Sequence, residues 1–159
     1  YLLIIVMVIL IRTFIITPVR VNGTSMDPTL KNGEIMILNK IKYNKNDIKR
    51  FDIVVIKMEK ELLIKRVIGL PNEEVKYIDN KLYINGEYIK EPFLNDDVYT
   101  GDTEGVFTDL VVPDDCVFAM GDNRSQSTDC RRFGCVPIKK IESKVAFRFW
   151  PLNKFGKVK

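Results

Sequence analysis

The chain has 159 residues, of which 46% are hydrophobic and 29% are charged, so one domain with a substantial core is expected and extensive disorder is not. Its formal net charge of +4 is too small to indicate a nucleic-acid-binding protein. The sequence contains no histidine, which excludes Ser-His-Asp and Cys-His catalytic units and histidine-ligated zinc sites. Acid–base chemistry near neutral pH therefore requires a carboxylate, a cysteine, a tyrosine or a lysine with a shifted pKa.

The first element is an apolar segment over residues 1–17, interrupted mainly by Arg12 and Thr13. As a helix it would span about 25 Å, against about 30 Å of membrane hydrocarbon, and a few more residues upstream would complete a span. The small residues that mark the cleavage site of a secretory signal are missing after it. We therefore predict a membrane anchor, an N-terminal transmembrane helix over residues 1–17. A buried core helix or strand is the alternative.

The rest of the chain, residues 18–159, is predicted as a series of short strands, because β-branched apolar runs alternate with turn residues. The clearest hairpin has Asn85-Gly86 as its turn, since this pair suits a type I′ turn. The pattern indicates an all-β domain made of folded antiparallel sheets or a partly open barrel. The predicted strands are 34–38, 52–57, 62–68, 81–84, 87–89, 106–112, 116–120 and 144–149.

Charge is unevenly distributed along this domain. Residues 91–115 carry eight acidic residues and no basic one, whereas residues 138–159 carry seven basic residues and one acidic residue. The acidic stretch belongs to a small excursion from the core, predicted at about 72–115. The basic tail is suited to anionic lipid, although an ordinary solvated face has the same composition.

Three sequence motifs carry groups that could perform catalysis. In the absence of histidine, a serine nucleophile needs another base, and a lysine can serve if burial keeps it neutral near pH 7. Ser25 lies in a turn directly after the apolar segment. Lys65 lies in the apolar run 62–68 and is preferred over Arg66, which cannot usefully be deprotonated. An exposed pair on a strand edge is the alternative for these two cations. The third motif is a polar, turn-rich stretch over residues 121–134.

Together these motifs resemble those of the type I signal peptidases, in the form found in Gram-positive bacteria. Residues 25–30 (SMDPTL) are similar to the nucleophile motif of the family, and residues 65–71 (KRVIGLP) to its lysine motif. Residues 121–124 (GDNR) are similar to its third motif, which continues through Ser127, Asp129 and Arg131. The resemblance covers nearly the whole chain.

This resemblance implies a membrane-bound serine endopeptidase that removes signal peptides from exported preproteins. The protein would cross the cell membrane once, with its catalytic domain on the extracytoplasmic side and in contact with membrane lipid. The resemblance also implies that Ser25 attacks the scissile carbonyl while neutral Lys65 takes its proton, and that the Ser25 backbone N–H donates to the oxyanion. Ser127 would orient Lys65, and Asp129 and Arg131 would form a supporting ion pair.

The family's substrates carry small residues at the first and third positions before the cut, which implies shallow apolar pockets. Val21, Leu30 and Ile64 are candidate wall residues. The resemblance implies no cofactor, no metal and no nucleic-acid partner.

The chain departs from the family pattern at four positions, and none of them removes Ser25 or Lys65. Gly23 stands where some members carry a serine that donates to the oxyanion, and Cys130 replaces a usual serine. Phe51 and Asn72 stand where glycine is common, and asparagine tolerates positive φ better than most residues.

The three cysteines, Cys116, Cys130 and Cys135, are too sparse for a disulfide scaffold, and the simplest interpretation is three reduced thiols. A Cys130–Cys135 bridge is the alternative, and a zinc site lacks a fourth ligand. Three other functions stay open: a self-cleaving Ser–Lys protease of the repressor type, a conjugation-type processing peptidase, and a membrane-anchored β module that binds exported chains without cutting them.

Overall fold

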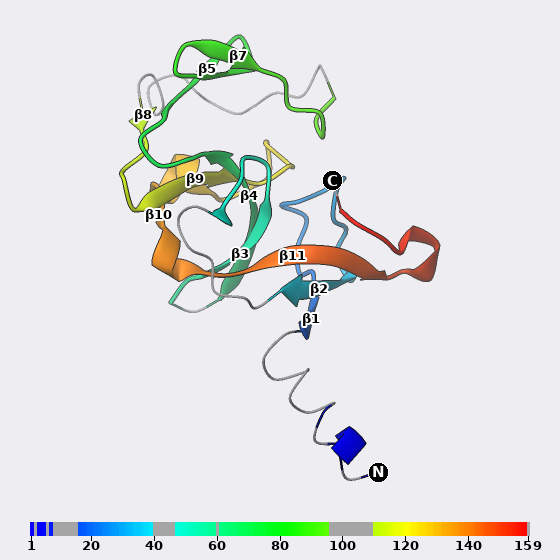
Figure 1. The fold of residues 1–159 in the computed structure, drawn as a ribbon. Helices are drawn as coiled ribbons and strands as arrows, with labels where there is room; N and C mark the ends of the chain where they lie inside the picture. Colours follow the sequence, from blue (N-terminus) through cyan, green and yellow to red (C-terminus); the bar gives the residue numbers. More distant parts are fainter. Residues whose placement is uncertain are drawn as a thin grey trace.

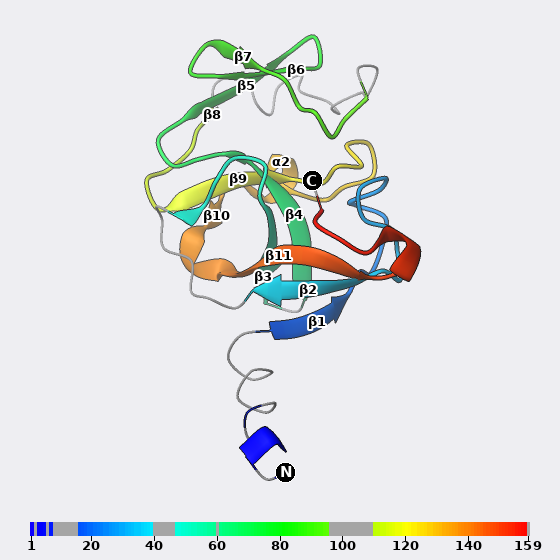
Figure 2. The same ribbon diagram turned by 45° about the vertical axis from the view of Figure 1, so that its right-hand side comes forward.

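A computed structural model of the chain describes residues 1, 3–5, 7, 16–39, 47–59, 61–95 and 110–158. The described strands form two antiparallel sheets (Figures 1 and 2). The large sheet has the strand order β1-β2-β11-β3-β4-β9-β10, and the small sheet has the order β7-β6-β5-β8. The strands are β1 (Ile16–Arg20), β2 (Ile35–Asn39), β3 (Ile53–Lys57), β4 (Leu62–Gly69), β5 (Glu74–Ile78), β6 (Lys81–Ile84), β7 (Glu87–Ile89), β8 (Leu110–Val111), β9 (Cys116–Met120), β10 (Val136–Pro137) and β11 (Ile141–Trp150).

The large sheet curls into a half-barrel around an apolar interior, and the small sheet lies over its β4–β9 side (Figure 2). Alternation along the strands divides the core into two clusters. One cluster includes Met26, Leu30 and Val55, and the other includes Val67 and Phe118. The prediction of an all-β fold with folded sheets or a partly open barrel is therefore confirmed for the described part of the chain.

The short helical elements are α2 (Cys130–Phe133), η2 (Ile138–Lys140) and η3 (Leu152–Lys154). Helix α2 begins after Asp129, whose side chain accepts a hydrogen bond from the Arg131 backbone N–H, as N-capping residues commonly do.

Local turn chemistry explains the small sheet. Asn85 and Gly86 have φ of 51° and 81° and join β6 to β7, which confirms the predicted hairpin. A second two-residue turn, Asp79-Asn80, joins β5 to β6 with φ of 49° and 62°. This turn and β5 were not predicted, because the turn contains no glycine. The small sheet lies within residues 72–115, where the excursion was predicted.

Several strand boundaries differ from the prediction. β1 was not predicted; it begins at Ile16, within the range assigned to the anchor, because pairing with β2 decides its conformation. β10 was not predicted either, since two residues carry no periodic pattern. β8 is limited to Leu110–Val111, and residues 106–109 of the predicted strand lie outside the described residues. β11 begins three residues earlier than predicted.

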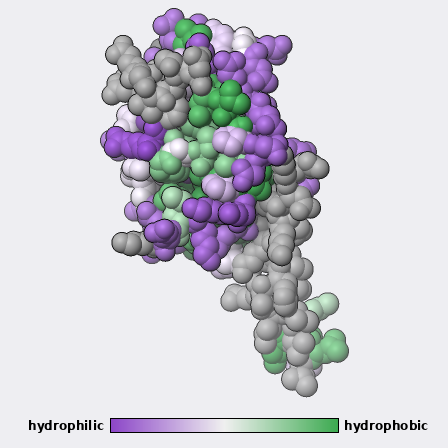
Figure 3. All heavy atoms as spheres, turned by 90° about the vertical axis from the view of Figure 1, so that its left-hand side faces the viewer, coloured by the Kyte–Doolittle hydropathy of each residue, from purple (hydrophilic) through white to green (hydrophobic). Residues whose placement is uncertain are grey.

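Most of the predicted anchor lies outside the described residues. Across the residues that the structure describes, no helix is both long enough and apolar enough to cross a membrane. Of the anchor residues that are described, Leu3, Ile4, Ile5 and Met7 are at least half exposed. Figure 3 shows apolar side chains at the end of the molecule that projects away from the β domain.

Candidate active site

Strand β4 and the turn after β1 bring Ser25 and Lys65 together, although forty residues separate them in the sequence. The Lys65 Nζ donates a hydrogen bond of 2.8 Å to the Ser25 Oγ. The turn that holds Ser25 is closed by backbone hydrogen bonds from Asp27 N to Thr24 O and from Leu30 N to Met26 O. Met26 and Leu30 of this turn are buried in the core cluster that also contains Val55. Their burial attaches the turn to the half-barrel on the side facing β4.

The two cations of β4 point to opposite faces of the strand, as its two-residue period requires. Both are buried, with 2% of each residue exposed. Lys65 faces Ser25, whereas the Arg66 guanidinium donates two hydrogen bonds to Asp122, at 2.9 and 2.7 Å. The alternative of an exposed pair is therefore wrong, and of these two cations Lys65 is the one that faces Ser25.

The environment of Lys65 favours a neutral amine. Burial is the largest effect and lowers the pKa of Lys65 below its ordinary value of 10.5, because a buried ammonium loses its hydration. The negative charges of Asp129 and Glu61 oppose this change. A lysine that acts as a base near neutral pH must be desolvated, and the burial of Lys65 provides this desolvation.

A cleft of about 500 Å³ contains the Ser25–Lys65 pair. Its walls come from β1 and the chain that follows it on one side, and from the first half of β4 on the other. Val21 and Ile64, two of the predicted wall residues, line it. The third, Leu30, is instead fully buried in the core cluster that contains Met26 and Val55, because the turn directs its side chain into that cluster.

The loop that follows β9, residues 121–124, clamps the Ser25 turn. The Asn123 backbone N–H donates to the Ser25 carbonyl at 3.0 Å, and its Nδ2 donates to the Thr24 carbonyl at 3.1 Å. A Cβ atom on Gly121 would overlap both the Ser25 carbonyl oxygen and the Ser127 hydroxyl. A residue without a side chain is therefore required at position 121 for this close approach.

Asp129 and Arg131 form an ion pair, as the resemblance implies. The Arg131 Nε and one terminal nitrogen each donate to the Asp129 carboxylate at 2.9 Å, and the Gly121 N–H donates to the same carboxylate at 3.0 Å. Burial by itself raises the pKa of Asp129, but the hydrogen bonds and charge of Arg131, together with the contributions of the Gly121 N–H and Ser127, hold the pKa below its ordinary value. Asp129 is therefore an anion at neutral pH.

Ser127 is buried beside Gly121, and its hydroxyl has no partner in hydrogen-bonding geometry among the described residues. It lies close enough to the Asp129 carboxylate to contribute to lowering its pKa. Among the described residues, Ser127 therefore makes no hydrogen bond to Lys65, the residue that it was predicted to orient, and the Nζ of Lys65 donates to Ser25 instead.

Gly121, Asp122 and Asn123 stand in the third motif, but their sequence positions predicted no role for them. Their contacts with Arg66 and Ser25 join residues that are distant in the sequence. Glu91, which contacts Arg124, was missed for the same reason. Its only local signal is a position in an acidic stretch, where it resembles its neighbours.

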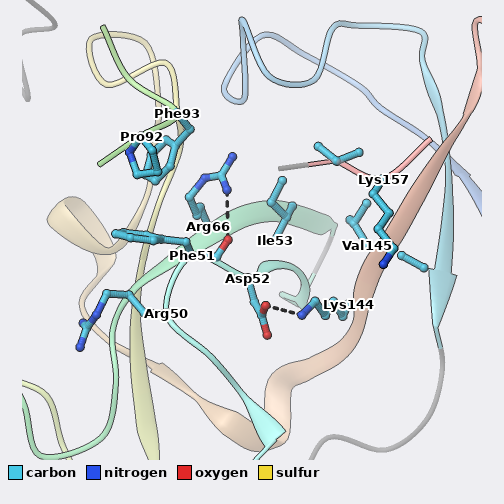
Figure 4. Close-up of a pocket in the computed structure, with 12 residues that line it drawn as sticks. Arg50, Phe51, Asp52, Ile53, Arg66, Pro92, Phe93, Lys144, Val145 and Lys157 are labelled. Carbon is cyan, nitrogen blue, oxygen red and sulfur yellow. Dashed lines mark hydrogen bonds and ion pairs between the residues drawn. The ribbon is translucent and has the colours of Figure 1, made fainter. Parts of the chain in front are cut away.

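A second cavity, of about 430 Å³, lies on the side of β4 that carries Arg66 (Figure 4). Its apolar lining includes Phe51 and Phe93, and Asp52 forms an ion pair with Lys144 at its edge. Phe51 has φ of 68°, a left-handed backbone conformation that favours glycine.

The three cysteines are free thiols, as their spacing favours. Burial raises the pKa of Cys116 to about 11 and that of Cys130 to about 12, so both stay protonated near neutral pH and are poor nucleophiles.

Comparison with known proteins places these observations in one family. Residues 1–150 match the family model described as "Signal peptidase, peptidase S26", which covers both Ser25 and Lys65. The chain is 42% identical over 156 residues to signal peptidase I of Bacillus caldolyticus, covering 92% of this chain and 86% of the relative. It is 37% identical over 166 residues to signal peptidase IB of Staphylococcus aureus, covering 94% and 86%. The crystal structure of a signal peptidase I from Enterococcus faecalis matches with a TM-score of 0.54 and 34% identity, covering 62% of this chain and 96% of that one.

Proposed function

Because the chain belongs to the peptidase S26 family of signal peptidases, we propose that it cleaves signal peptides from exported preproteins with Ser25 as nucleophile and Lys65 as base. Family membership makes it a serine endopeptidase. The observation that carries the assignment of residues is the 2.8 Å hydrogen bond from a buried lysine to a serine in a cleft.

In the proposed reaction, Lys65 transfers protons both when the ester forms and when it is hydrolysed. It takes the proton of the Ser25 hydroxyl as the Oγ attacks the scissile carbonyl, and it gives that proton to the leaving amine when the peptide bond breaks. A water molecule, activated by the Lys65 amine, then hydrolyses the Ser25 ester and releases the signal peptide. The Ser25 backbone N–H stabilises the oxyanion, and Gly23, whose φ is 90°, leaves the approach to it open.

The shape of the cleft supports an extended peptide as substrate. Among the described strands, β1 pairs only with β2, so its other edge can offer backbone groups to a substrate strand. Side chains of Val21 and Ile64 make parts of the wall apolar. Small residues before the cleavage site fit such a wall, and this is the substrate preference that we propose.

Membrane attachment through the N-terminal segment is part of the same proposal. The apolar sequence of residues 1–17 and the exposure of its described members support a single transmembrane helix in contact with lipid. The β domain would then lie on the extracytoplasmic side of the cell membrane, where preproteins emerge.

The test is cleavage of a preprotein in detergent or lipid, with sequencing of the new N-terminus. Ser25→Ala and Lys65→Ala should each abolish cleavage, because either change removes one half of the dyad. Ser125→Ala and Lys57→Ala, at exposed positions, are the matched controls and should keep normal turnover. Near-normal turnover by either dyad variant would refute the mechanism.

A further inference from the structure

A short segment outside the cleft contacts both arginines that hold the 121–124 loop. It consists of residues 91–93, which follow β7, and we refer to it as the strap. Glu91 pairs with Arg124, and the Phe93 ring packs against Arg66. None of the three motifs includes this segment.

The Glu91 contact is a buried network of three side chains. The Arg124 guanidinium forms an ion pair with the Glu91 carboxylate and donates to the Tyr77 hydroxyl at 2.9 Å. The Tyr77 hydroxyl donates to Glu91 at 3.1 Å. The side chain of Arg124 is fully buried and that of Glu91 is 6% exposed, so this carboxylate compensates a cation that water cannot reach.

The Phe93 contact is an aromatic one. The Arg66 guanidinium carbon lies 3.9 Å from the centre of the Phe93 ring, within the range of a cation–π interaction. The edge-to-face contact between Phe93 and Phe51 has a centroid distance of 5.1 Å. Figure 4 shows Phe93 above Arg66, with Arg66 bonded to the Phe51 carbonyl.

Arg66 and Arg124, which the strap contacts, are both hydrogen-bonded to the 121–124 loop. Arg66 holds Asp122 with two hydrogen bonds, and the Arg124 Nε donates to the Gly121 carbonyl at 3.0 Å. The Arg124 carbonyl in turn accepts a hydrogen bond of 2.7 Å from Arg131. Since Asn123 of the same loop holds the Ser25 turn, the contacts run without a break from the strap to the nucleophile.

We propose that Glu91 and Phe93 are positioning residues for the reaction, which set the location of Ser25 relative to Lys65 through Arg124 and Arg66. This inference rests on the proposed function. The strap then supports the position of the nucleophile, although none of its residues lines the cleft.

The experiment compares kcat and KM for preprotein cleavage by the full chain and three variants, Glu91→Gln, Tyr77→Phe and Phe93→Leu. A small displacement of a nucleophile costs up to about 100-fold in rate, so we expect kcat to fall by about 10- to 100-fold in Glu91→Gln, with KM changed less than about threefold. Tyr77→Phe and Phe93→Leu should lower kcat by smaller factors. Glu91→Asp, which keeps the carboxylate, should recover part of the lost kcat.

The controls are Glu87→Gln and Tyr88→Leu, exposed residues of β7 in the same sheet, which should leave kcat unchanged. Thermal unfolding identifies the variants that are folded at the assay temperature. If Glu91→Gln is unfolded at that temperature, the kcat values of Tyr77→Phe and Phe93→Leu test the proposal. Folded variants with wild-type kcat and a lower melting temperature would overturn the proposal, because the strap would then only stabilise the fold. Ser25→Ala separates the two hypotheses: cleavage by that variant contradicts the proposed function, whereas wild-type kcat in the strap variants contradicts this inference alone.

Discussion

At the scale of single residues, the groups around Lys65 act on its pKa in opposite directions. Burial and the charge of Arg131 lower it, while the charges of Asp129 and Glu61 raise it. Asp129 is held by hydrogen bonds and cannot be changed without disturbing the site. Glu61 is exposed at the rim of the cleft, so its charge can be removed with little effect on the packing.

We expect Glu61→Gln to move the pH profile of cleavage toward lower pH. Removal of a negative charge favours the neutral amine, so the pKa of Lys65 falls and the rise of kcat/KM with pH begins earlier. The displacement should shrink in high salt, which screens exposed charges. Glu59→Gln, in the same exposed turn, is the control. An unchanged profile, or a move toward higher pH, would show that Glu61 does not act on the base.

At the scale of elements, β4 places one cation in the cleft and the other in a structural ion pair. The Arg66–Asp122 pair joins β4 to the loop after β9, and both side chains are almost completely buried. The exposed pair Lys57–Glu142, between β3 and β11, provides a comparison in the same sheet. Loss of one partner from a buried pair leaves an uncompensated charge, whereas water compensates an exposed one.

Asp122→Ala should therefore lower the free energy of unfolding by about 3–5 kcal/mol. Glu142→Ala should lower it by less than about 1 kcal/mol. Denaturant titrations of both variants, monitored by tryptophan fluorescence, measure the difference. Similar losses in the two variants would mean that burial of the pair contributes little to stability.

At the scale of the whole molecule, the curl of the large sheet creates the cleft. β1 is an edge strand, followed in the sheet by β2, β11, β3 and β4. Because the sheet is curved, the start of β4 lies across the cleft from β1 and the Ser25 turn. The apolar segment precedes β1 directly. The proposed anchor would therefore hold one wall of the cleft near the membrane surface, where a membrane-bound preprotein presents its cleavage site.

Removal of residues 1–15 tests this arrangement, because β1 begins at Ile16 and all described strands are kept. We expect the shortened protein to stay in the supernatant when vesicles of anionic and neutral lipid are sedimented, whereas the full chain sediments with them. Cleavage of a short soluble peptide should be retained. If the shortened protein still sediments at low salt but not at high salt, the basic tail rather than the apolar segment binds the lipid.

Particular residues show which features of the fold and site local sequence patterns can predict. The Asn85-Gly86 hairpin and the run around Lys65 were predictable, since turn propensity and apolar alternation are local properties. The Asp79-Asn80 turn and β1 were not, because the first lacks glycine and the second takes its conformation from β2. Cleft residues Val21 and Ile64 were predicted, but Leu30 was misplaced, since the direction of a side chain in a turn depends on packing.

The sequence by itself determined the family, the all-β class and the two residues that we propose as nucleophile and base, because motif chemistry, strand periodicity and the absence of histidine are all readable along the chain. Only the tertiary structure decided that Lys65 rather than Arg66 faces Ser25, and that Glu91 and Phe93 support the loop that holds the nucleophile. Burial and pairing depend on segments that are far apart in sequence, and no local pattern specifies which of them meet.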